Sequence, residues 1–476
     1  MTIQDKRQFY INGAWVDPIA PNDFPVENPA TLDVLAMISL GNEADVDRAV
    51  AAARAAFDDF SRSSKDDRIA LLESIRAVYK RRIGEFGDLI SAEMGAPRDL
   101  AHGSQADVGI GHLDGVLDAL KRMDFAEVSP NGDTLLHEAV GVCGLITPWN
   151  WPVNQIVLKV LPALAAGCTM VLKPSELTPL DAMLYAEVLE EAGVPKGVFN
   201  LVNGEGPVAG AALSRHRDVD MMSFTGSTRG GTAVSRDAAE TIKRVSLELG
   251  GKSPNLIFAD ADIDAAVRDG VATCFQNTGQ SCDAPTRMLV DRSVYDRAVA
   301  VAREAGAAQK VDVPTKPGDH IGPQVSQLQY DRVQRLIQAG IDDGATLLVG
   351  GLGKPEGFNI GHYTRPTIFA DVSNDMVIAR EEVFGPVLAM IPFADEDEAI
   401  AIANDTPYGL SAYVQTGDDA RATRVAARLR AGMVHINGAD INWGSPFGGY
   451  KMSGIGREGG THGIHDFLEV KVVARP

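Results

Sequence analysis

The sequence predicts an α/β fold, because short apolar runs typical of buried strands alternate with helical segments along most of the chain. Apolar residues recur at helical spacing from Val46 to Phe57 and again within 66–93. A length of 476 residues predicts two to four domains of about 100–200 residues each. An apolar content of 45% and a charged content of 23% are ordinary for a globular enzyme with a large core.

The helices are expected to begin at recognisable caps. Asn42, with Asp45 three residues later, is predicted to cap the first helix, and the helix within 66–93 is expected to end near Gly95. A further helix should follow Pro152, and another should begin at Thr178 as cap, with Pro179 in its first turn. A helix is also expected at 331–339, and strands are expected at 140–147, 169–173, 197–202, 221–225, 253–258, 287–290, 387–393 and 468–473.

Composition excludes several function classes. The formal net charge of −20 disfavours DNA, RNA and anionic lipid as partners, because the field of the chain repels phosphate. The most apolar stretch, 153–172, contains Lys159 and Pro162 and is not expected to span a membrane. The first residues, Met-Thr-Ile-Gln-Asp-Lys-Arg, lack the apolar core of a signal peptide, so we expect a cytoplasmic protein.

The four cysteines show no spacing typical of a metal or disulfide framework. Cys143, Cys168, Cys274 and Cys282 form no CxxC pair, and the nine histidines do not cluster with them. We therefore expect no structural zinc, no other metal and no disulfide, which fits a reducing compartment.

The run QNTGQSC (276–282) carries the strongest chemical signal. Most lone cysteines are small buried apolar residues, but Cys282 follows glycine and polar residues, and a carboxylate, Glu248, lies upstream in the run ELGGKSP. An ionised thiol is a strong nucleophile, and a separate carboxylate can act as a base. This pairing predicts covalent catalysis by Cys282.

Two segments suit a nucleotide. The run 221–231 is predicted to form a strand, a glycine turn and a helix, where free N–H groups can bind pyrophosphate. The spacing from Gly226 to Gly231 is GxxxxG and not GxGxxG, and a plain strand–helix turn explains it equally well. Lys173 opens KPSE (173–176) after a strand, where it and Glu176 suit ribose hydroxyls, although a surface turn is the simpler explanation of this segment alone.

Three further segments are ambiguous singly. Asn150 lies within PWNWP (148–152), where its amide could donate to an oxyanion or the aromatic residues could form a packing corner. The run EEVFGP (381–386) suits a ribose contact or an exposed acidic turn. The glycine-rich run 446–454 is predicted to be a loop, of the kind that can close over a site.

The ordered set of motifs resembles the NAD(P)-dependent aldehyde dehydrogenase superfamily over nearly the whole chain. The motifs that carry the resemblance are PWNWP (148–152), KPSE (173–176), FTGS (224–227), LELGGKSP (247–254), GQSC (279–282), EEVFGPV (381–387) and PFGGYKMSG (446–454). The resemblance implies oxidation of an aldehyde to a carboxylic acid, with NAD(P)+ as the hydride acceptor.

The resemblance assigns a role to each matching residue. Cys282 would attack the aldehyde, Asn150 would hold the oxyanion and Glu248 would activate water against the thioester, with Lys159 near the site. The positions implied for the cofactor are Ile146, Thr147, Pro148, Trp149, Lys173, Ser175, Glu176, Gly206, Pro207, Phe224, Gly226, Ser227, Gly231, Leu249, Glu382 and Phe384.

Two residues depart from the expected pattern. Asp283 follows the nucleophile, and a carboxylate pointing at the thiolate would raise the pKa of the thiol. Arg229 lies in the pyrophosphate turn, where it would either support the anion or reach a 2′-phosphate and permit NADP. Glu176 favours a free ribose diol, so the expected cofactor is NAD, with NADP possible.

A helix that opens at Asn150 would place four residues on one face toward the aldehyde. The residues implied for the substrate tunnel are Trp151, Asn154, Gln155, Leu158, Gln276, Ser281, Trp443 and Phe447. Because Asn154, Gln155 and Gln276 are polar, we expect a substrate with a hydroxyl, amide or similar group and an apolar or aromatic portion. No cationic residue suited to a carboxylate tail is evident, which disfavours a dedicated semialdehyde enzyme.

The family's fold implies two Rossmann-like α/β domains and a small β oligomerisation element. The expected ranges are 1–120 and 140–249 for the NAD-binding domain, 250–460 for the catalytic domain, and 121–139 with 461–476 for the oligomerisation element. The C-terminal strand would be an unprotected edge, so a homodimer or homotetramer is expected.

Two alternatives stay open at this point. A CoA-acylating semialdehyde dehydrogenase would need no hydrolytic base, against which Glu248 counts. A non-catalytic structural protein on the same fold is disfavoured by the presence of Cys282, Asn150 and Glu248 together.

Overall fold

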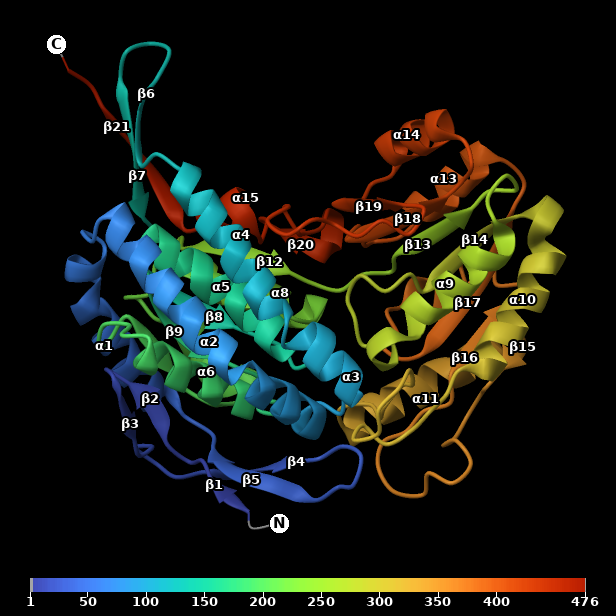
Figure 1. Cartoon of the computed structure of the whole chain (residues 1–476), viewed down its shortest axis with the longest axis horizontal. Helices are drawn as coiled ribbons and strands as arrows, with labels where there is room; N and C mark the ends of the chain where they lie inside the picture. Colours follow the sequence, from blue (N-terminus) through green and yellow to red (C-terminus); the bar gives the residue numbers. More distant parts are fainter. Residues whose placement is uncertain (1–2, 476) are drawn as a thin grey trace.

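Two large sheets lie side by side in the computed structural model, which describes residues 3–475 (Figure 1). The first has eight strands in the order β20-β12-β11-β8-β9-β10-β2-β3, and β12, β11, β8, β9 and β10 run parallel. Its strands are β2 (Phe9–Ile11), β3 (Ala14–Val16), β8 (Val142–Ile146), β9 (Thr169–Lys173), β10 (Phe199–Leu201), β11 (Met221–Thr225), β12 (Arg244–Glu248) and β20 (Gly454–Ile455).

Helices cover both faces of this sheet, as parallel strands require. Two apolar clusters mark the two faces: one joins the sheet to α2, α4, α5 and α6, and the other joins it to α1, α7 and α8. The helices of this half are α1 (Glu43–Phe60), α2 (Lys65–Glu93), α3 (Arg98–Leu100), α4 (Val108–Arg122), α5 (Pro152–Ala166), α6 (Leu180–Glu191), α7 (Ala211–Arg215), α8 (Thr228–Ala239) and α15 (Gly460–Asp466).

The second sheet has seven strands in the order β15-β16-β17-β14-β13-β18-β19, all parallel to their neighbours except β15. Its strands are β13 (Pro254–Ile257), β14 (Arg287–Asp291), β15 (Thr346–Val349), β16 (Thr367–Ala370), β17 (Val387–Phe393), β18 (Ser411–Gln415) and β19 (Met433–Ile436). Its helices are α9 (Ile263–Phe275), α10 (Tyr295–Ala308), α11 (Gln327–Asp342), α12 (Val377–Arg380), α13 (Glu396–Asn404) and α14 (Asp419–Arg428). The predicted α/β class is confirmed.

Two small sheets complete the fold. Near the N-terminus, β1 (Gln4–Asp5), β5 (Val34–Ser39) and β4 (Asp23–Glu27) form one of them. The other is an arm that projects from the body, in the order β21-β7-β6, with β6 (Ala126–Val128), β7 (Thr134–Ala139) and β21 (Leu468–Val473) (Figure 1). Because α4 continues to Arg122, the hairpin occupies only the later part of the expected segment 121–139. The domain boundaries stay a prediction.

Local expectations about caps are confirmed at α1 and wrong at α6. Asn42 and Asp45 form a reciprocal capping box at the start of α1. Thr178 does not cap α6, because Pro179 occupies the cap position and the Thr178 hydroxyl has no hydrogen-bond partner in the described chain. Instead, the buried Glu93 carboxylate accepts hydrogen bonds from the backbone N–H groups of Leu180 and Asp181 at 2.8 and 2.9 Å. A distant carboxylate therefore replaces the local cap.

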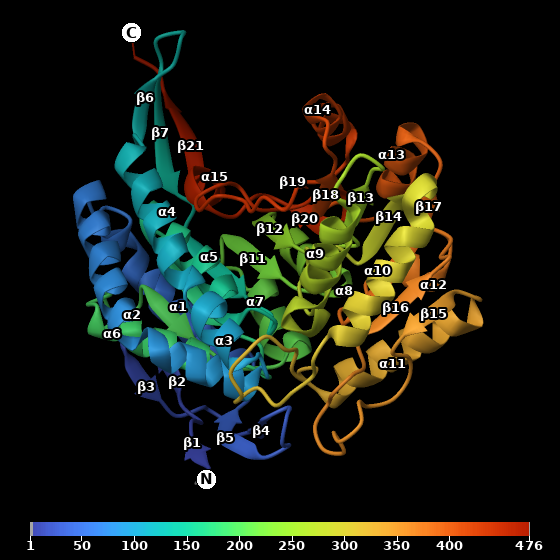
Figure 2. The same ribbon diagram turned by 45° about the vertical axis from the view of Figure 1, so that its right-hand side comes forward.

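The chain between β19 and α15 crosses from the second sheet back to the first, as Figures 1 and 2 both show. Ser453 joins this crossing to the segment after β12: its carbonyl accepts from the backbone N–H of Leu249 at 2.9 Å, and its hydroxyl donates to the carbonyl of Gly250 at 2.7 Å. The glycine-rich run 446–454 is thus fastened over the end of β12. No helix within residues 3–475 is both long and apolar enough to cross a lipid bilayer.

Candidate active site

Cys282 lies where the two large sheets meet, on the wall of a cavity of about 840 Å³. The residue is half-buried, whereas Cys143, Cys168 and Cys274 are fully buried. The four cysteines are free thiols. Only Cys282 combines a free thiol with access to a cavity, so it is the one candidate nucleophile among the cysteines.

The loop that carries Cys282 is held in an unusual backbone conformation. Asn277 and Thr278 both have positive φ angles, of 53° and 59°, which non-glycine residues rarely adopt. Buried hydrogen bonds hold them there: the Gln105 side chain donates to Asn277 Oδ1 at 2.9 Å, and the Thr278 hydroxyl donates to the carbonyl of Gly322 at 3.2 Å. The position of the thiol is therefore fixed by contacts from both halves of the molecule.

Asn150 lies against this loop. Its side-chain Nδ2 donates to the carbonyl of Gln280 at 3.0 Å, and the Asn277 side chain donates to the carbonyl of Asn150 at 2.8 Å. The neighbouring Trp151 donates from its indole N–H to the hydroxyl of Ser281 at 2.8 Å. The Asn150 amide thus binds the backbone two residues before the nucleophile Cys282, where it can serve as an oxyanion donor.

Glu248, at the end of β12, is buried close to the same loop. Its carboxylate oxygens have no hydrogen-bond partner within residues 3–475, and a Cβ on Gly448 would lie 2.5 Å from Oε1. Three residues later, a Cβ on Gly251 would lie 2.2 Å from the carbonyl oxygen of Cys282. The glycines let the segment after Glu248 and the covering loop pack closely around the site.

A buried ion pair lies next to Glu248. Lys159, on α5, donates from Nζ to Glu458 Oε1 at 2.5 Å and to the hydroxyl of Ser223 at 3.1 Å. The sequence predicted Lys159 near the site but missed Glu458. The signal was weak but present, because Glu458 is an acid in the glycine-rich segment that follows the PFGGYKMSG motif.

Burial favours the neutral forms of both the Cys282 thiol and the Glu248 carboxyl. Burial raises the pKa of the Cys282 thiol well above its usual range, and the charges of Asp283, Glu382 and Glu248 raise it further. Burial likewise raises the pKa of Glu248, and the charge of Glu458 adds to this, while the charge of Lys159 opposes it. The expected effect of Asp283 on the thiol is therefore present in the structure.

The predicted nucleotide residues gather at the carboxyl ends of adjacent parallel strands. Ile146, the last residue of β8, pairs with Lys173 on β9 and with Phe224 on β11. Lys173 is buried and donates from Nζ to the carbonyls of Pro174 and Gly204 at 2.7 and 2.6 Å, with Glu176 Oε2 at 3.5 Å. Thr147, Pro148, Trp149, Ser175, Gly206 and Pro207 follow the ends of β8, β9 and β10.

The start of α8 has the features of an anion site. Ser227 caps the helix by accepting from the backbone N–H of Gly230, and Cβ atoms on Gly226 and Gly230 would lie 2.7 and 2.6 Å from the Phe224 ring. A Cβ on Gly231 would likewise meet the Leu249 side chain at 2.6 Å. Glycine at these positions lets the turn pack tightly against Phe224 and Leu249, and the first turn of α8 leaves backbone N–H groups without helical acceptors.

Glu382 and Phe384 lie close to the catalytic segments. Glu382 Oε1 accepts from the backbone N–H of Gly251 at 2.9 Å, and burial raises the pKa of this carboxyl to about 6. The ring of Phe384 meets that of Trp149 edge-on, with centroids 5.3 Å apart. Two contacts between separate predicted motifs are thus present: Glu382 binds the segment after Glu248, and Phe384 meets Trp149.

Comparison with known sequences agrees with this geometry. A sequence model described as the aldehyde dehydrogenase family matches residues 15–473. The chain belongs to the aldehyde dehydrogenase family. It is an NAD(P)-dependent enzyme that oxidises aldehydes, and the family predicted from the sequence motifs is confirmed.

Relatives cover the chain nearly end to end. A 3-succinoylsemialdehyde-pyridine dehydrogenase from a Pseudomonas species is 52% identical over 472 residues, 99% of each chain. The crystal structure of an aldehyde dehydrogenase from Bartonella henselae, 52% identical, matches with a TM-score of 0.98 over 99% of each chain. A mutant of aldehyde dehydrogenase C from Pseudomonas syringae, solved with NAD+ and octanal, is 49% identical with a TM-score of 0.97 over 98% of this chain and 96% of that one.

The aldehyde-side cavity collects most of the residues predicted for the substrate. Trp151, Asn154, Gln155, Gln276, Ser281, Trp443 and Phe447 all line it with Cys282. Leu158, one turn further along α5, is buried and lies outside this lining. Asn154 Oδ1 lies 2.7 Å from Nε2 of His112, a contact that no sequence motif indicated. Within residues 3–475, no three His, Cys, Asp or Glu side chains are grouped to hold a metal ion.

Proposed function

We propose that this aldehyde dehydrogenase works through a thioester on Cys282 that is hydrolysed by water activated by Glu248. The observation that supports it most is that the Asn150 amide binds the Cys282 loop, while the buried Glu248 carboxylate, which has no hydrogen-bond partner within residues 3–475, lies close enough for its charge to raise the pKa of the thiol. Because burial favours the neutral thiol, Cys282 first gives up its proton to water. The thiolate sulfur then attacks the aldehyde carbon and the carbonyl oxygen becomes an oxyanion, toward which Asn150 Nδ2 donates.

The hydride then leaves the substrate carbon, and the C–O double bond re-forms as a thioester. Bound NAD+ supplies the acceptor for that hydride. Glu248 takes a proton from water as the water oxygen attacks the thioester carbon. The C–S bond breaks, the Cys282 thiolate is released, and the carboxylic acid leaves. A carboxylate base beside the thiol supports hydrolysis of the thioester, because a CoA-acylating enzyme would need no such base.

The nucleotide surface fits NAD+. Lys173 and Glu176 would hold the adenosine ribose, with Ser175 beside them, and the N–H groups at the start of α8 would hold the pyrophosphate. Glu382, with Phe384, would hold the nicotinamide ribose. Ile146, Thr147, Pro148, Trp149, Gly206, Pro207, Phe224, Gly226, Ser227, Gly231 and Leu249 would form the rest of the surface. Glu176 favours NAD over NADP, because a carboxylate repels a 2′-phosphate.

The substrate tunnel is proposed to accept an aldehyde with a polar group and an apolar or aromatic portion. Trp151 and Phe447 line the cavity beside the amides of Asn154 and Gln155. The 52% identical relative is named for a substrate with a pyridine group, which agrees with such a tunnel. A large advantage in kcat/KM for hexanal over a hydroxylated aldehyde of equal length would exclude the polar group.

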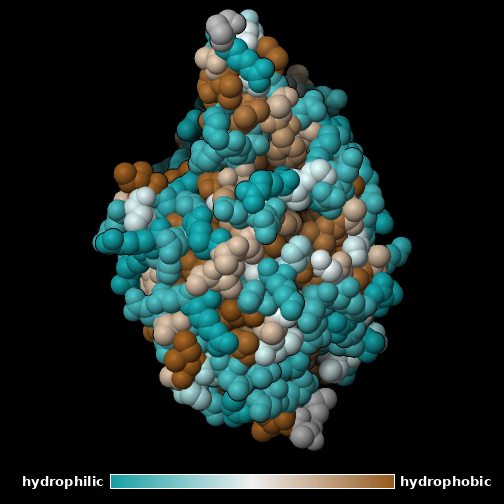
Figure 3. All heavy atoms as spheres, turned by 90° about the vertical axis from the view of Figure 1, so that its left-hand side faces the viewer, coloured by the Kyte–Doolittle hydropathy of each residue, from teal (hydrophilic) through white to brown (hydrophobic). Residues whose placement is uncertain are grey.

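We also infer that the arm pairs with a second copy of the chain, giving a homodimer or homotetramer. β21 lies at the edge of its three-stranded sheet, and Val128, Val470 and Val472 on this sheet are 58–72% exposed. Figure 3 shows hydrophobic side chains gathered on the projecting arm. A long exposed edge with apolar side chains is normally covered by a partner.

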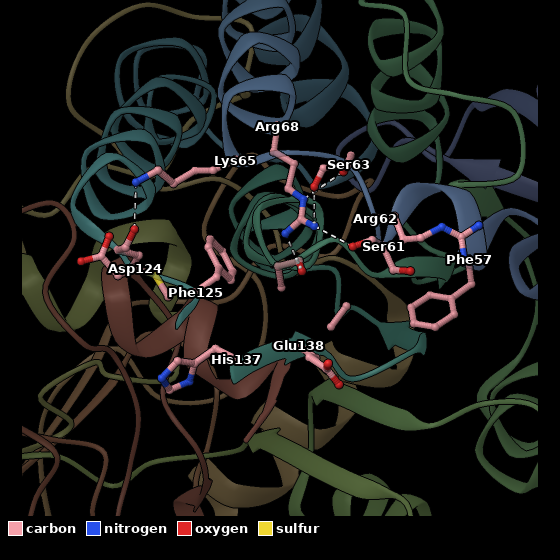
Figure 4. Close-up of a pocket in the computed structure, with 13 residues that line it drawn as sticks. Phe57, Ser61, Arg62, Ser63, Lys65, Arg68, Asp124, Phe125, His137 and Glu138 are labelled. Atoms are coloured by element: carbon pink, nitrogen blue, oxygen red, sulfur yellow. Dashed lines mark hydrogen bonds between the residues drawn. The ribbon is translucent and has the colours of Figure 1, made fainter. Parts of the chain in front are cut away.

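A concave surface at the foot of the arm supports the same inference. A cavity of about 600 Å³ lies there, lined among others by Arg68, Phe125 and His137 (Figure 4). The Arg68 guanidinium lies 5.4 Å from the centroid of the Phe125 ring. We propose that this hollow receives part of the partner copy.

We further place the enzyme in the cytoplasm, because free thiols suit a reducing compartment.

Cys282→Ala tests the mechanism. The variant should form no NADH from any aldehyde that the parent enzyme oxidises, while its affinity for NAD+ should stay within about threefold. Retained turnover in Cys282→Ala would exclude a covalent mechanism at this residue.

A further inference from the structure

The aldehyde cavity carries an unbalanced charge. Its lining includes five carboxylates, and among the described residues that line it there is no lysine or arginine. The five are Asp107, Asp262, Asp269, Asp283 and Asp440. None of them forms an ion pair with a basic side chain of the described chain. A cavity of this kind attracts cations and repels anions before any specific contact forms.

Among the five carboxylates, Asp283 is next to the proposed nucleophile, because it directly follows Cys282 in the chain. Asp107, Asp262, Asp269 and Asp440 are exposed, whereas Asp283 is half-buried in the same wall as the nucleophile. Its backbone carbonyl accepts from the hydroxyl of Tyr413 at 3.2 Å, and its carboxylate forms no hydrogen bond or ion pair with another side chain of residues 3–475. Burial raises the pKa of the Asp283 carboxyl, and a hydrogen bond from its own backbone N–H opposes this.

His435 adds a buried hydrogen-bond acceptor to the same wall. Its ring stacks on Tyr413 with centroids 4.5 Å apart and planes inclined by 12°. Nδ1 lies 2.9 Å from the carbonyl oxygen of Ala439. Because a carbonyl only accepts, Nδ1 carries the proton and Nε2 presents a lone pair when the ring is neutral.

That lone pair has no partner. His435 is only 8% exposed, and Nε2 finds no hydrogen-bond partner within residues 3–475. A buried acceptor without a donor costs about 1–3 kcal/mol, which a ligand with an N–H group would relieve. Asp283, Tyr413 and His435 therefore line one part of the cavity, where Asp283 supplies a negative charge and His435 an acceptor without a partner.

We propose that the substrate of this enzyme carries a protonated nitrogen with at least one N–H, bound by the Asp283 carboxylate and the Nε2 lone pair of His435. This rests on the proposed function, since the site shares its cavity with Cys282. Tyr413, Trp151 and Phe447 line the same cavity, and aromatic rings also attract cations. The substrate class is thus an aminoaldehyde or an aldehyde on a protonated nitrogen ring. Asp283 and His435 set the specificity.

Matched substrate pairs test this. In 3-aminopropanal and butanal, and in 6-aminohexanal and heptanal, an ammonium group replaces a methyl group of similar size. The parent enzyme should prefer the aminoaldehyde of at least one pair by about tenfold in kcat/KM, and 4-oxobutanoate should be the poorest substrate. Asp283→Asn should reduce the preference by about tenfold. The ratio within a pair is the readout, because any change in thiol reactivity affects both members equally.

Controls separate charge from hydrogen bonding. Asp58→Asn, on the exposed face of α1, changes net charge equally and should leave each ratio unchanged. The N-trimethyl form of 3-aminopropanal keeps the charge without an N–H, so it should lose part of the preference. An equal preference for the N-trimethyl form would overturn the role of His435. A neutral aldehyde preferred in both pairs, or a ratio unaffected by Asp283→Asn, would overturn the proposal.

If no aldehyde is oxidised, the proposed function is contradicted but the nitrogen site is not. Protection of Cys282 from alkylation then tests the nitrogen site by binding alone. Hexylamine should slow alkylation of Cys282 by iodoacetamide more than 1-hexanol does at the same concentration. Asp283→Asn should abolish that difference. Equal protection by the amine and the alcohol in the parent enzyme would overturn the nitrogen site.

Discussion

The Nζ of Lys159 lies 2.5 Å from Oε1 of Glu458, in an ion pair whose side chains are only 1% and 6% exposed. The two charges act on Glu248 in opposite directions: Glu458 raises the pKa of its carboxyl and Lys159 lowers it. Burial is the largest cause of the raised pKa of Glu248, and the charges of the pair adjust that pKa in both directions.

Replacing either partner should move the pH profile in a known direction. A base acts only when deprotonated, so activity should rise with pH through the pKa of Glu248. Glu458→Gln removes a negative charge and should shift the rising limb of kcat to lower pH by about one unit. Lys159→Met removes a positive charge and should shift it to higher pH. Identical shifts, or none, in the two variants would show that the ion pair does not act through Glu248.

Asn150→Ala should weaken catalysis without removing the nucleophile. The amide that now donates to the carbonyl of Gln280 would no longer be present to hold the oxyanion. Loss of one such donor lowers kcat by about 100–1000-fold, or about 2.7–4 kcal/mol. Steady-state kinetics with a good aldehyde would measure this, with Cys282 alkylation as a check that the thiol stays accessible. A loss below about threefold would contradict the role of Asn150.

Asp283→Asn should make Cys282 more reactive toward a neutral alkylating agent. The Asp283 charge raises the pKa of the thiol, so its removal should lower that pKa and increase the thiolate fraction at a fixed pH. The rate with iodoacetamide at pH 7 should increase by up to about tenfold, which one pKa unit allows. Because the other three cysteines are fully buried, alkylation of the folded enzyme reports Cys282. A slower rate would mean that the carboxylate acts otherwise than by its charge.

Charging the arm should break the oligomer. Val470 and Val472 are 58% and 60% exposed on β21, and lysines at both positions would oppose burial against a second copy. Light scattering should then give the mass of a single chain. Leu328→Lys, at a side chain on α11 that is 82% exposed, is the matched control and should leave the mass unchanged. A parent enzyme that is already monomeric at micromolar concentration would contradict the proposed assembly.

The sequence predicted the parts of the fold that local chemistry determines. Strands 169–173, 221–225, 387–393 and 468–473 were predicted with the bounds that the structure shows. The first three are short, largely apolar runs, and the last is rich in β-branched valine. The cap of α6 was wrong, because Glu93 reaches it from a helix far away in the sequence. Such a contact depends on tertiary packing, which no local pattern records.

In the candidate site too, residues within a local motif were predicted, and residues placed only by tertiary contacts were missed. Cys282, Asn150 and Glu248 were found because each lies in a dense motif. Gln105 was missed because it occupies an unremarkable helical segment and acts only by its contact with Asn277. His435 was missed for a similar reason: its free Nε2 becomes visible only when Ala439 and Tyr413 are placed around the ring.

Trapping the thioester tests the central claim most directly. Glu248→Gln, incubated with NAD+ and an aldehyde and then digested for mass spectrometry, should carry the acyl group on Cys282, because the step that removes it has lost its base. NADH should appear in a burst of about one equivalent per active site. Unmodified Cys282 together with continued turnover, or an acyl group on another residue, would contradict a thioester at Cys282 hydrolysed through Glu248.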